Sequence, residues 1–271
     1  MLTTLIFSKN RACQLNLLLK SIQQNLPNFD LEDVCVLYTA TTSRFFAGYE
    51  ILEDSFPEVN FILQYDFEEN TRAILHDANE YVCFFVDDNI IYRQSSLSPV
   101  MVSDFMSKVP VCCISLRLGT NTTIQDQYHQ VPAILPRTFF REGEFLVWDW
   151  SNCPPHGNFG YPFSVDGHIY KTTTVMDGLT FDFDTPNAFE GRYDVKHFEN
   201  FMACIEHSIL VNNPLNLVGS SNNNAGKFYG HTLEELNNKF LNYYTIDLNS
   251  IMETNVIGCH QEIPMEFIKD V

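Results

Sequence analysis

The stretch YVCFFVDDN, residues 81–89, decides how this chain folds. Its first part, Tyr81 to Val86, is aromatic, β-branched or otherwise apolar and carries no charge, which indicates a buried strand. It ends abruptly in Asp87, Asp88 and Asn89. A strand this apolar is normally covered on both faces, as in a parallel α/β sheet, and such sheets bind ligands at the carboxyl ends of their strands. The stretch therefore predicts a ligand-binding edge at Asp87.

The paired carboxylates of Asp87 and Asp88 call for a physical explanation. Two like charges side by side repel, and an unpaired carboxylate is expensive to remove from water. A divalent cation would resolve the repulsion, and hard oxygen ligands suit Mg²⁺ or Mn²⁺. The alternative is a solvated turn, because Asp-Asn after a strand is ordinary turn chemistry.

Regular alternation of strands and helices precedes this motif. Buried strands are predicted at 2–7, 34–38 and 59–63, and helices with apolar residues at helical spacing at 14–25, 45–53 and 67–79. Such βαβ alternation predicts a parallel sheet with right-handed crossovers over residues 1 to about 90.

The second half has a different character. The pattern predicts helices at 98–107, within 195–209 and at 233–243, the last with Thr232 as N-cap and Glu235 in a capping box. Strands are predicted at 111–118 and 165–170, and 119–160 is rich in turn residues and aromatics. Residues 219–231 suit a lid over a ligand. No linker separates two domains.

Composition limits the possible partners. The chain has 271 residues and a formal net charge of −18, without a Lys/Arg-rich run, which argues against a nucleic-acid partner. Its eight cysteines include no C-x-x-C pair, which favours reduced thiols in a cytoplasmic protein. No signal peptide or integral membrane segment is predicted.

A polar loop and a single arginine are candidates for binding a nucleotide. Ser8, Lys9, Asn10 and Arg11 form a polar loop after the first strand, where open α/β sheets hold phosphates or bases. The loop lacks the glycines of dinucleotide-binding and P-loop motifs, and a solvated turn is the alternative. Arg72, early in the helix that leads to Asp87, is placed to reach a diphosphate or to pair with Glu68 or Glu69.

The FSKNR loop, the second strand and the VDDN motif together resemble the GT-A glycosyltransferases of the family-2-like type. The resemblance implies a single α/β domain over 1–271 with a mostly parallel central sheet flanked by helices. Residues 1–92 would bind the nucleotide sugar, and 93–271 would form an elaborated acceptor half. It also implies a metal-dependent transferase using Mn²⁺ or Mg²⁺ and a donor that is most often UDP-linked. Asp87 would contact the ribose, and Asp87 and Asp88 would bind the metal. Asn89 stands where many members have a third Asp; it could ligate the metal through its side-chain carbonyl but brings no charge. His231 is a further candidate ligand.

An inverting transferase of this type also needs a general base to deprotonate the acceptor hydroxyl. The resemblance places Glu190 in that role, and Asp166 is the second candidate for the base. A purely structural explanation exists for each residue. Glu190 could be an acidic residue favoured in the first turn of a helix, and Asp166 could belong to an Asp-Gly hairpin turn.

Trp148, Asp149 and Trp150 are candidates for binding a glycan or other hydroxyl acceptor, by stacking and hydrogen bonding, although a Trp in the core is equally consistent. A different class of function is a non-catalytic carbohydrate- or protein-binding module on a degenerate transferase fold.

Overall fold

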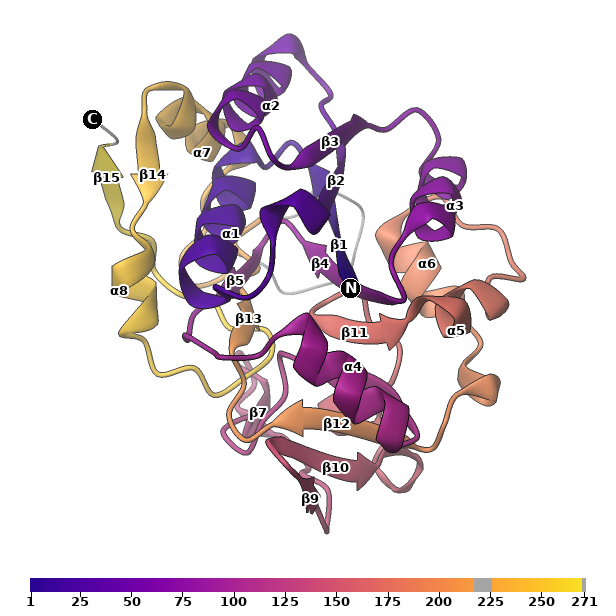
Figure 1. Cartoon of the computed structure of the whole chain (residues 1–271). Helices are drawn as coiled ribbons and strands as arrows, with labels where there is room; N and C mark the ends of the chain where they lie inside the picture. Colours follow the sequence, from indigo (N-terminus) through magenta and orange to yellow (C-terminus); the bar gives the residue numbers. More distant parts are fainter. Residues whose placement is uncertain (217–225, 270–271) are drawn as a thin grey trace.

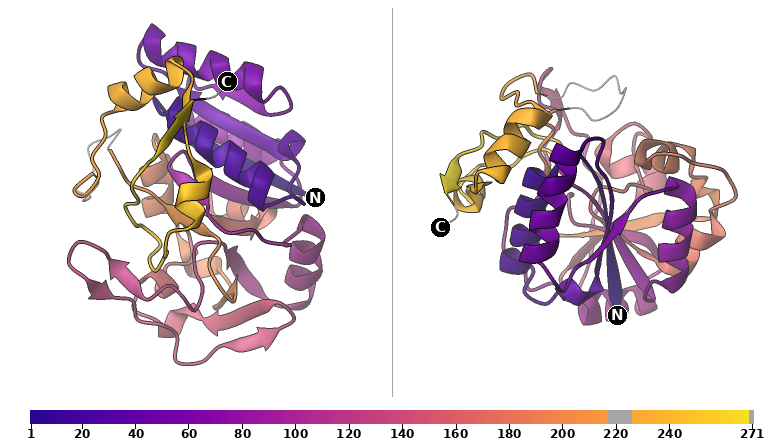
Figure 2. Two further views of the ribbon diagram at one scale, coloured as in Figure 1. Left: turned by 90° about the vertical axis from the view of Figure 1, so that its left-hand side faces the viewer. Right: turned by 90° about the horizontal axis from the view of Figure 1, so that it is seen from above.

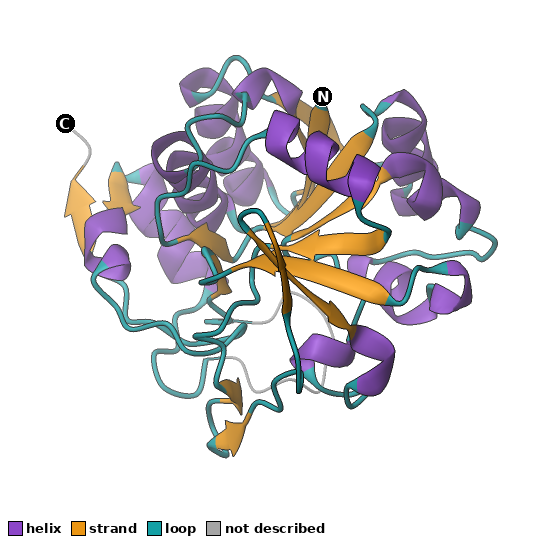
Figure 3. Cartoon of the chain, turned by 60° about the horizontal axis from the view of Figure 1, so that its bottom comes forward, coloured by secondary structure: helices purple, strands orange, loops and turns teal. Residues whose placement is uncertain are grey.

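The computed structural model describes residues 1–216 and 226–269. Its centre is a nine-stranded sheet in the order β3-β2-β1-β4-β11-β6-β12-β10-β9 (Figures 1 and 3). The strands are β1 (Leu2–Lys9), β2 (Val34–Thr39), β3 (Asn60–Leu63), β4 (Tyr81–Val86), β6 (Val111–Ser115), β9 (Phe140–Glu142), β10 (Phe145–Asp149), β11 (His168–Lys171) and β12 (Phe201–Ile205). Strands from both halves of the chain thus share one sheet, which confirms the predicted α/β fold.

Strand direction explains where the site lies. β1 pairs in parallel with β2 and β4, β2 with β3, and β6 with β12. β11 runs antiparallel between β4 and β6, so those two strands point the same way. β10 is antiparallel to both β12 and β9. The carboxyl ends of β1, β4, β6 and β12 therefore share one edge, and the sheet is mixed around a mostly parallel centre.

Helices cover both faces of the sheet (Figure 2). One apolar cluster joins the sheet to α1 (Ala12–Asn25), α2 (Ser43–Ser55), α4 (Pro99–Lys108), α7 (Leu233–Leu241) and α8 (Leu248–Met252). A second cluster, rich in aromatic rings, joins the other face to α3 (Phe67–Asp77), α5 (Thr172–Asp177) and α6 (Pro186–Arg192). Burial on two faces explains why β1, β2 and β4 are nearly continuous apolar runs.

Short elements complete the chain. They are the strands β5 (Asn89–Ile91), β7 (Ile124–Asp126), β8 (Val131–Pro132), β13 (Leu210–Asn212), β14 (Tyr244–Ile246) and β15 (Phe267–Lys269), with 3-10 turns at Leu31–Asp33, Trp150–Asn152, Asn158–Gly160 and Val195–His197. β5 pairs with β13, outside the main sheet. The predicted capping box of Thr232 and Glu235 is present at the start of α7.

One predicted helix is wrong. Within 195–209 the chain forms a 3-10 turn at Val195–His197 and then strand β12, not an α-helix. The run Phe201–Ile205 is short and apolar, and it pairs with β6 on one side and β10 on the other. Short apolar runs are ambiguous between helix and strand, and distant partners decide the outcome here.

All eight cysteines carry free thiols, and none of the eight takes part in a disulfide. Among the described residues, no helix combines the length and the hydrophobicity needed to cross a bilayer.

Candidate functional site

Asp87 and Asp88 lie where β4 ends, at the carboxyl edge of the sheet. The Asp87 amide donates to the carbonyl of Phe7 at 3.1 Å, so the turn begins in register with β1. Asp88 is followed directly by β5, which leaves the sheet and pairs with β13. Both carboxylates are buried, with 3% and 9% of their residue surface exposed. The solvated-turn alternative therefore does not describe them.

The loop after β1 binds Asp87 directly. Oδ2 of Asp87 accepts hydrogen bonds from the Ser8 hydroxyl and the Lys9 amide, each at 2.9 Å. Asn10 has a left-handed backbone with φ of 60° and exchanges two hydrogen bonds with Thr41, which tie the loop to the end of β2. The structure thus brings together the predicted loop and the predicted carboxylate.

Arg11 makes the closest charge contacts of the site. Its Nη1 lies 2.9 Å from Oδ1 of Asp87 and 2.8 Å from Oδ2 of Asp88. Its Nε donates to Oδ1 of Asn216 at 2.9 Å, and its Nη2 donates to the Asn216 carbonyl. Burial raises the pKa of Asp88 to about 6, against the charge of Arg11, and the charges of Asp87 and Asp166 add to the rise.

Asp166 lies in a neighbouring polar cluster that sequence reasoning did not assemble. Its carboxylate accepts from Asn89 Nδ2, from Asn212 Nδ2 at 3.3 Å and from Arg117 Nη1 at 3.1 Å. The half-exposed ring of His260 approaches it through Nε2 at 3.0 Å. Asp166 is therefore a buried, fourfold-bonded carboxylate rather than an exposed hairpin turn.

The pKa values of Asp166 and of the nearby His168 are both lowered. Burial opposes its ionisation, but the hydrogen bond and charge of His260 and the charge of Arg117 outweigh burial and hold the pKa of Asp166 well below its usual range. Burial is also the main cause that keeps the pKa of His168 well below its ordinary value, with the charge of Arg117 adding to it.

Sequence reasoning missed three residues of this cluster, namely Arg117, Asn212 and His260. Arg117 had a weak signal, because it follows the apolar run of β6 at the same edge as Asp87. His260 had none: an isolated bridge with Asn212 places it, and nothing local in the sequence predicts that pairing.

Glu190 lies close to this second cluster. It stands in α6 after Thr185, whose side chain caps the helix, and Pro186 at the first turn. Its Oε2 accepts from the Val165 amide at 2.7 Å and from the Ser164 hydroxyl at 3.0 Å, so it fixes the segment leading to Asp166. Its partners therefore belong to the edge of the sheet rather than to its own helix.

Several predicted residues lie elsewhere. Arg72 bonds Glu68 and the carbonyls of Leu179 and Phe181, so the structure supports the helix-pair alternative and not contact with a diphosphate. The His231 ring packs edge-on against the ring of Phe267, with 5.9 Å between the two ring centroids. Neither side chain has a contact with Asp87 or Asp88 in the described part of the chain.

The proposed acceptor residues need a correction. Trp148 is fully buried, and its Nε1 donates to the Phe159 carbonyl at 2.8 Å, so it is a core residue that no acceptor can reach. The reason is strand alternation in β10, which turns this ring into the second apolar cluster. Asp149 caps the turn at Trp150–Asn152, and Trp150 donates to the Glu199 carbonyl.

The predicted lid falls only partly within the structure. Residues 219–225 lie outside the described residues. Of the remainder, the amides of Lys227, Phe228 and Tyr229 all donate to the carboxylate of Glu262, at 2.8 to 2.9 Å.

The donor set does not fit a divalent metal in this arrangement. No group of three or more His, Cys, Asp or Glu side chains gathers for an ion among the residues described. Asn89 uses its Oδ1 to accept from the Val86 amide at 3.0 Å and its Nδ2 to donate to Asp166, so both ends of its side chain are already bonded within the protein.

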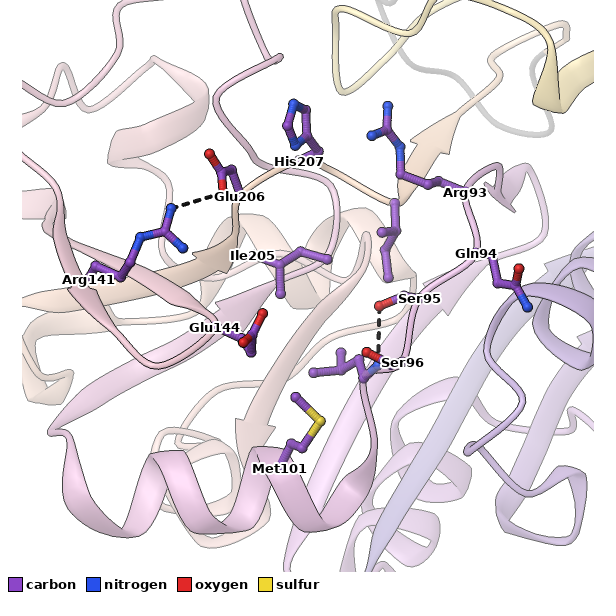
Figure 4. Close-up of a pocket in the computed structure, with 12 residues that line it drawn as sticks. Arg93, Gln94, Ser95, Ser96, Met101, Arg141, Glu144, Ile205, Glu206 and His207 are labelled. Atoms are coloured by element: carbon purple, nitrogen blue, oxygen red, sulfur yellow. Dashed lines mark hydrogen bonds and ion pairs between the residues drawn. The ribbon is translucent and has the colours of Figure 1, made fainter.

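A separate pocket of about 210 Å³ opens between the start of α4, the end of β12 and the β9–β10 hairpin (Figure 4). Arg141 and Glu206 form an ion pair of 2.9 Å at its rim. Arg93, Met101 and His207 also line it, but none of the predicted site residues does. This hollow is therefore distinct from the carboxylate edge.

The mixed sheet with helices on both faces defines an α/β fold similar to that of nucleotide-sugar glycosyltransferases of the GT-A type, and known proteins confirm this resemblance. One curated relative is the "Bifunctional glycosyltransferase pgtA" of Dictyostelium discoideum, 26% identical over 231 residues, which cover 77% of this chain and 29% of that protein. The solved structure of S. aureus TarS 1-349 in complex with UDP has a TM-score of 0.50 at 15% identity, covering 78% of this chain and 59% of that one. No protein-family model matches the chain.

Proposed function

We propose that this chain is a glycosyltransferase that moves a sugar from a nucleoside diphosphate sugar to an acceptor hydroxyl with inversion. The observation that carries the proposal is the contact between the loop after β1 and Asp87, made by Ser8, Lys9 and Arg11. Ligands of open α/β sheets bind at this edge. The glycosyltransferase name of the Dictyostelium relative and the UDP complex of TarS support the same class of reaction and a UDP-linked donor.

Residues 1–92 would form the donor half. The loop from Ser8 to Arg11, with Asp87, would hold the ribose and diphosphate, because hydroxyl, amide and guanidinium donors converge there. Preorganised cations stabilise the leaving diphosphate, which is where negative charge develops in the transition state.

Glu190 is the base that we favour for the acceptor hydroxyl. Asp166, the alternative, accepts from four donors and has a depressed pKa, which makes it a weak proton acceptor. Its role would be to hold Arg117 and His260 in place. Residues 93–271 would then bind the acceptor next to Glu190.

The sequence also predicts a Mn²⁺ or Mg²⁺ cofactor held by Asp87 and Asp88. Such an ion would neutralise the leaving diphosphate when bound. The proposed donor contacts do not depend on this ion, because the carboxylate oxygens are already bonded within the protein.

The test is UDP release from UDP-sugars in the presence of a panel of hydroxyl acceptors, together with UDP binding by calorimetry. We expect UDP to bind and one UDP-sugar to turn over, and Asp88→Ala to abolish release. A protein that binds glycans but no nucleotide would contradict the proposal and favour the non-catalytic binding module.

A further inference from the structure

The two ends of the Arg11 guanidinium face different partners. Nη1 lies between Asp87 and Asp88, at 2.9 and 2.8 Å, and is shared by the two carboxylates. Nε and Nη2 point to the other side and are bonded to Asn216. We propose that Arg11 is the cation of this site, and that its Nε and Nη2 edge binds the diphosphate in exchange for Asn216, so that donor binding requires no divalent ion. This inference rests on the proposed function.

Every carboxylate oxygen of the pair is already occupied. Oδ2 of Asp87 accepts from Ser8 and Lys9, and its Oδ1 accepts from Arg11. In Asp88, Oδ2 accepts from Arg11 and Oδ1 from Asn212 Nδ2 at 2.7 Å. A metal would have to displace a buried guanidinium and break several hydrogen bonds, and a charge left buried without its partner is strongly destabilising.

Arg11 is also built to stay in place. Its side chain is only 7% exposed, and its own amide donates to the hydroxyl of Tyr49 at 3.2 Å. The same hydroxyl bonds Ser8 at 2.7 Å, so one buried ring from α2 holds both ends of the loop. The cation is therefore fixed before a ligand arrives, as electrostatic preorganisation requires.

The chemistry of the edge facing Asn216 matches a phosphate. Nε and Nη2 of an arginine form a planar fork that bonds two oxygens of one phosphate, and such bidentate pairs are among the strongest hydrogen bonds in proteins. Asn216 now presents two oxygens, Oδ1 and the carbonyl, to this fork. These oxygens are neutral, so a phosphate would replace them with a charge-assisted pair.

The experiment is calorimetric titration of the protein with UDP, once in EDTA and once in Mn²⁺. We expect the same affinity within about twofold in both buffers, and no uptake of Mn²⁺ by the protein alone in electron paramagnetic resonance. Binding of UDP that appears only with Mn²⁺ would overturn the inference while leaving the proposed function intact. No UDP binding in either buffer would overturn both.

Variants assign the effect to Arg11. Arg11→Met should weaken UDP binding in EDTA by at least about tenfold, since a charge-assisted bidentate pair is lost. Arg141→Met, which removes an exposed arginine paired with Glu206, is the matched control and should keep wild-type affinity. Wild-type affinity in Arg11→Met would overturn the inference.

Asn216→Ala provides an independent test should Arg11→Met fail to fold. It removes Oδ1, one of the two oxygens that compete for the fork, but keeps Arg11 and both aspartates. We expect UDP affinity to stay equal or to rise in EDTA. A tenfold loss would show that Asn216, and not the fork beneath it, binds the ligand, and would overturn the proposed exchange.

Discussion

Two buried arginines lie at the same edge of the sheet and hold their aspartates in different ways. Arg11, after β1, lies between two carboxylates and is bonded to Asn216 as well. Arg117, after β6, has one carboxylate partner among the described residues, Asp166, and its Nε has no hydrogen-bond partner there. Asp166 is shared with the half-exposed ring of His260.

The difference fits the division of labour that the proposed function assigns to the two sides. The charges around Arg11 are closed off within the protein, which suits a rigid donor-binding site. The charges around Arg117 extend through Asp166 to a histidine that solvent reaches, and Glu190 lies near enough to Arg117 to contribute to its electrostatic environment. That side suits chemistry on the acceptor.

The largest effect should separate turnover from donor binding. Glu190→Gln keeps the shape and an oxygen for the Val165 amide but removes the proposed base, so we expect sugar transfer to fall by roughly 10²- to 10⁴-fold. UDP affinity, measured by calorimetry, should not change, because the proposed donor contacts lie around Arg11. Glu144→Gln in the β9–β10 loop serves as the control. Equal losses of turnover and UDP affinity would mean that Glu190 is structural.

The next largest effect concerns stability. Asp166→Asn leaves Arg117 buried without a carboxylate, and breaking a buried pair in this way costs about 3–5 kcal/mol of unfolding free energy. Asp88→Asn should cost less, since Arg11 keeps Asp87. Urea denaturation of the two variants measures both values. Equal losses would show that the second carboxylate beside Arg11 gives it no advantage over Arg117.

A smaller effect should appear in acid. His168 is fully buried, its Nε2 has no partner among the described residues, and its pKa lies well below 6.5 because of burial and the charge of Arg117. The unfolded chain takes up a proton near pH 6.5 and the folded chain does not, so stability falls as pH drops below that value. The slope is about 1.4 kcal/mol per pH unit for one histidine.

His168→Gln should remove this part of the pH dependence between pH 7 and 5. Urea denaturation of variant and wild type at several pH values gives the difference, in which the other titrating groups cancel. If the variant and the wild type show the same pH dependence of the unfolding free energy, His168 takes up its proton in the folded protein as well. Burial and the charge of Arg117 would then not lower its pKa.

The sequence predicts the first part of the fold well because its information is local there. Long periodic runs mark the elements from β1 to β4, and parallel strands bring Ser8, Arg11 and Asp87 to one edge by geometry alone. In contrast, β12 lies between β6 and β10, whose residues are far away in the chain, so its five residues carry no decisive local pattern.

The second cluster of the site was unpredictable for the same reason. Asp166 and Glu190 were identified by resemblance, but their partners depend on where distant segments return to the edge. His260 reaches Asp166 through its bridge with Asn212, and no local spacing encodes that approach. Trp148 shows the reverse case: an aromatic pattern typical of sugar binding lies in the core because of strand alternation.

The smallest effect should come from a third arginine that lies outside both clusters. The Arg72 side chain is 34% exposed, pairs with Glu68 on its own helix and bonds two carbonyls of the loop after α5. Solvent weakens such a pair, so Arg72→Met should leave UDP affinity unchanged and lower the melting temperature only slightly. Calorimetry and thermal unfolding measure the two quantities. A tenfold loss of UDP affinity would place α3 in the donor site, and the electrostatics of donor binding would then involve a cation beyond Arg11.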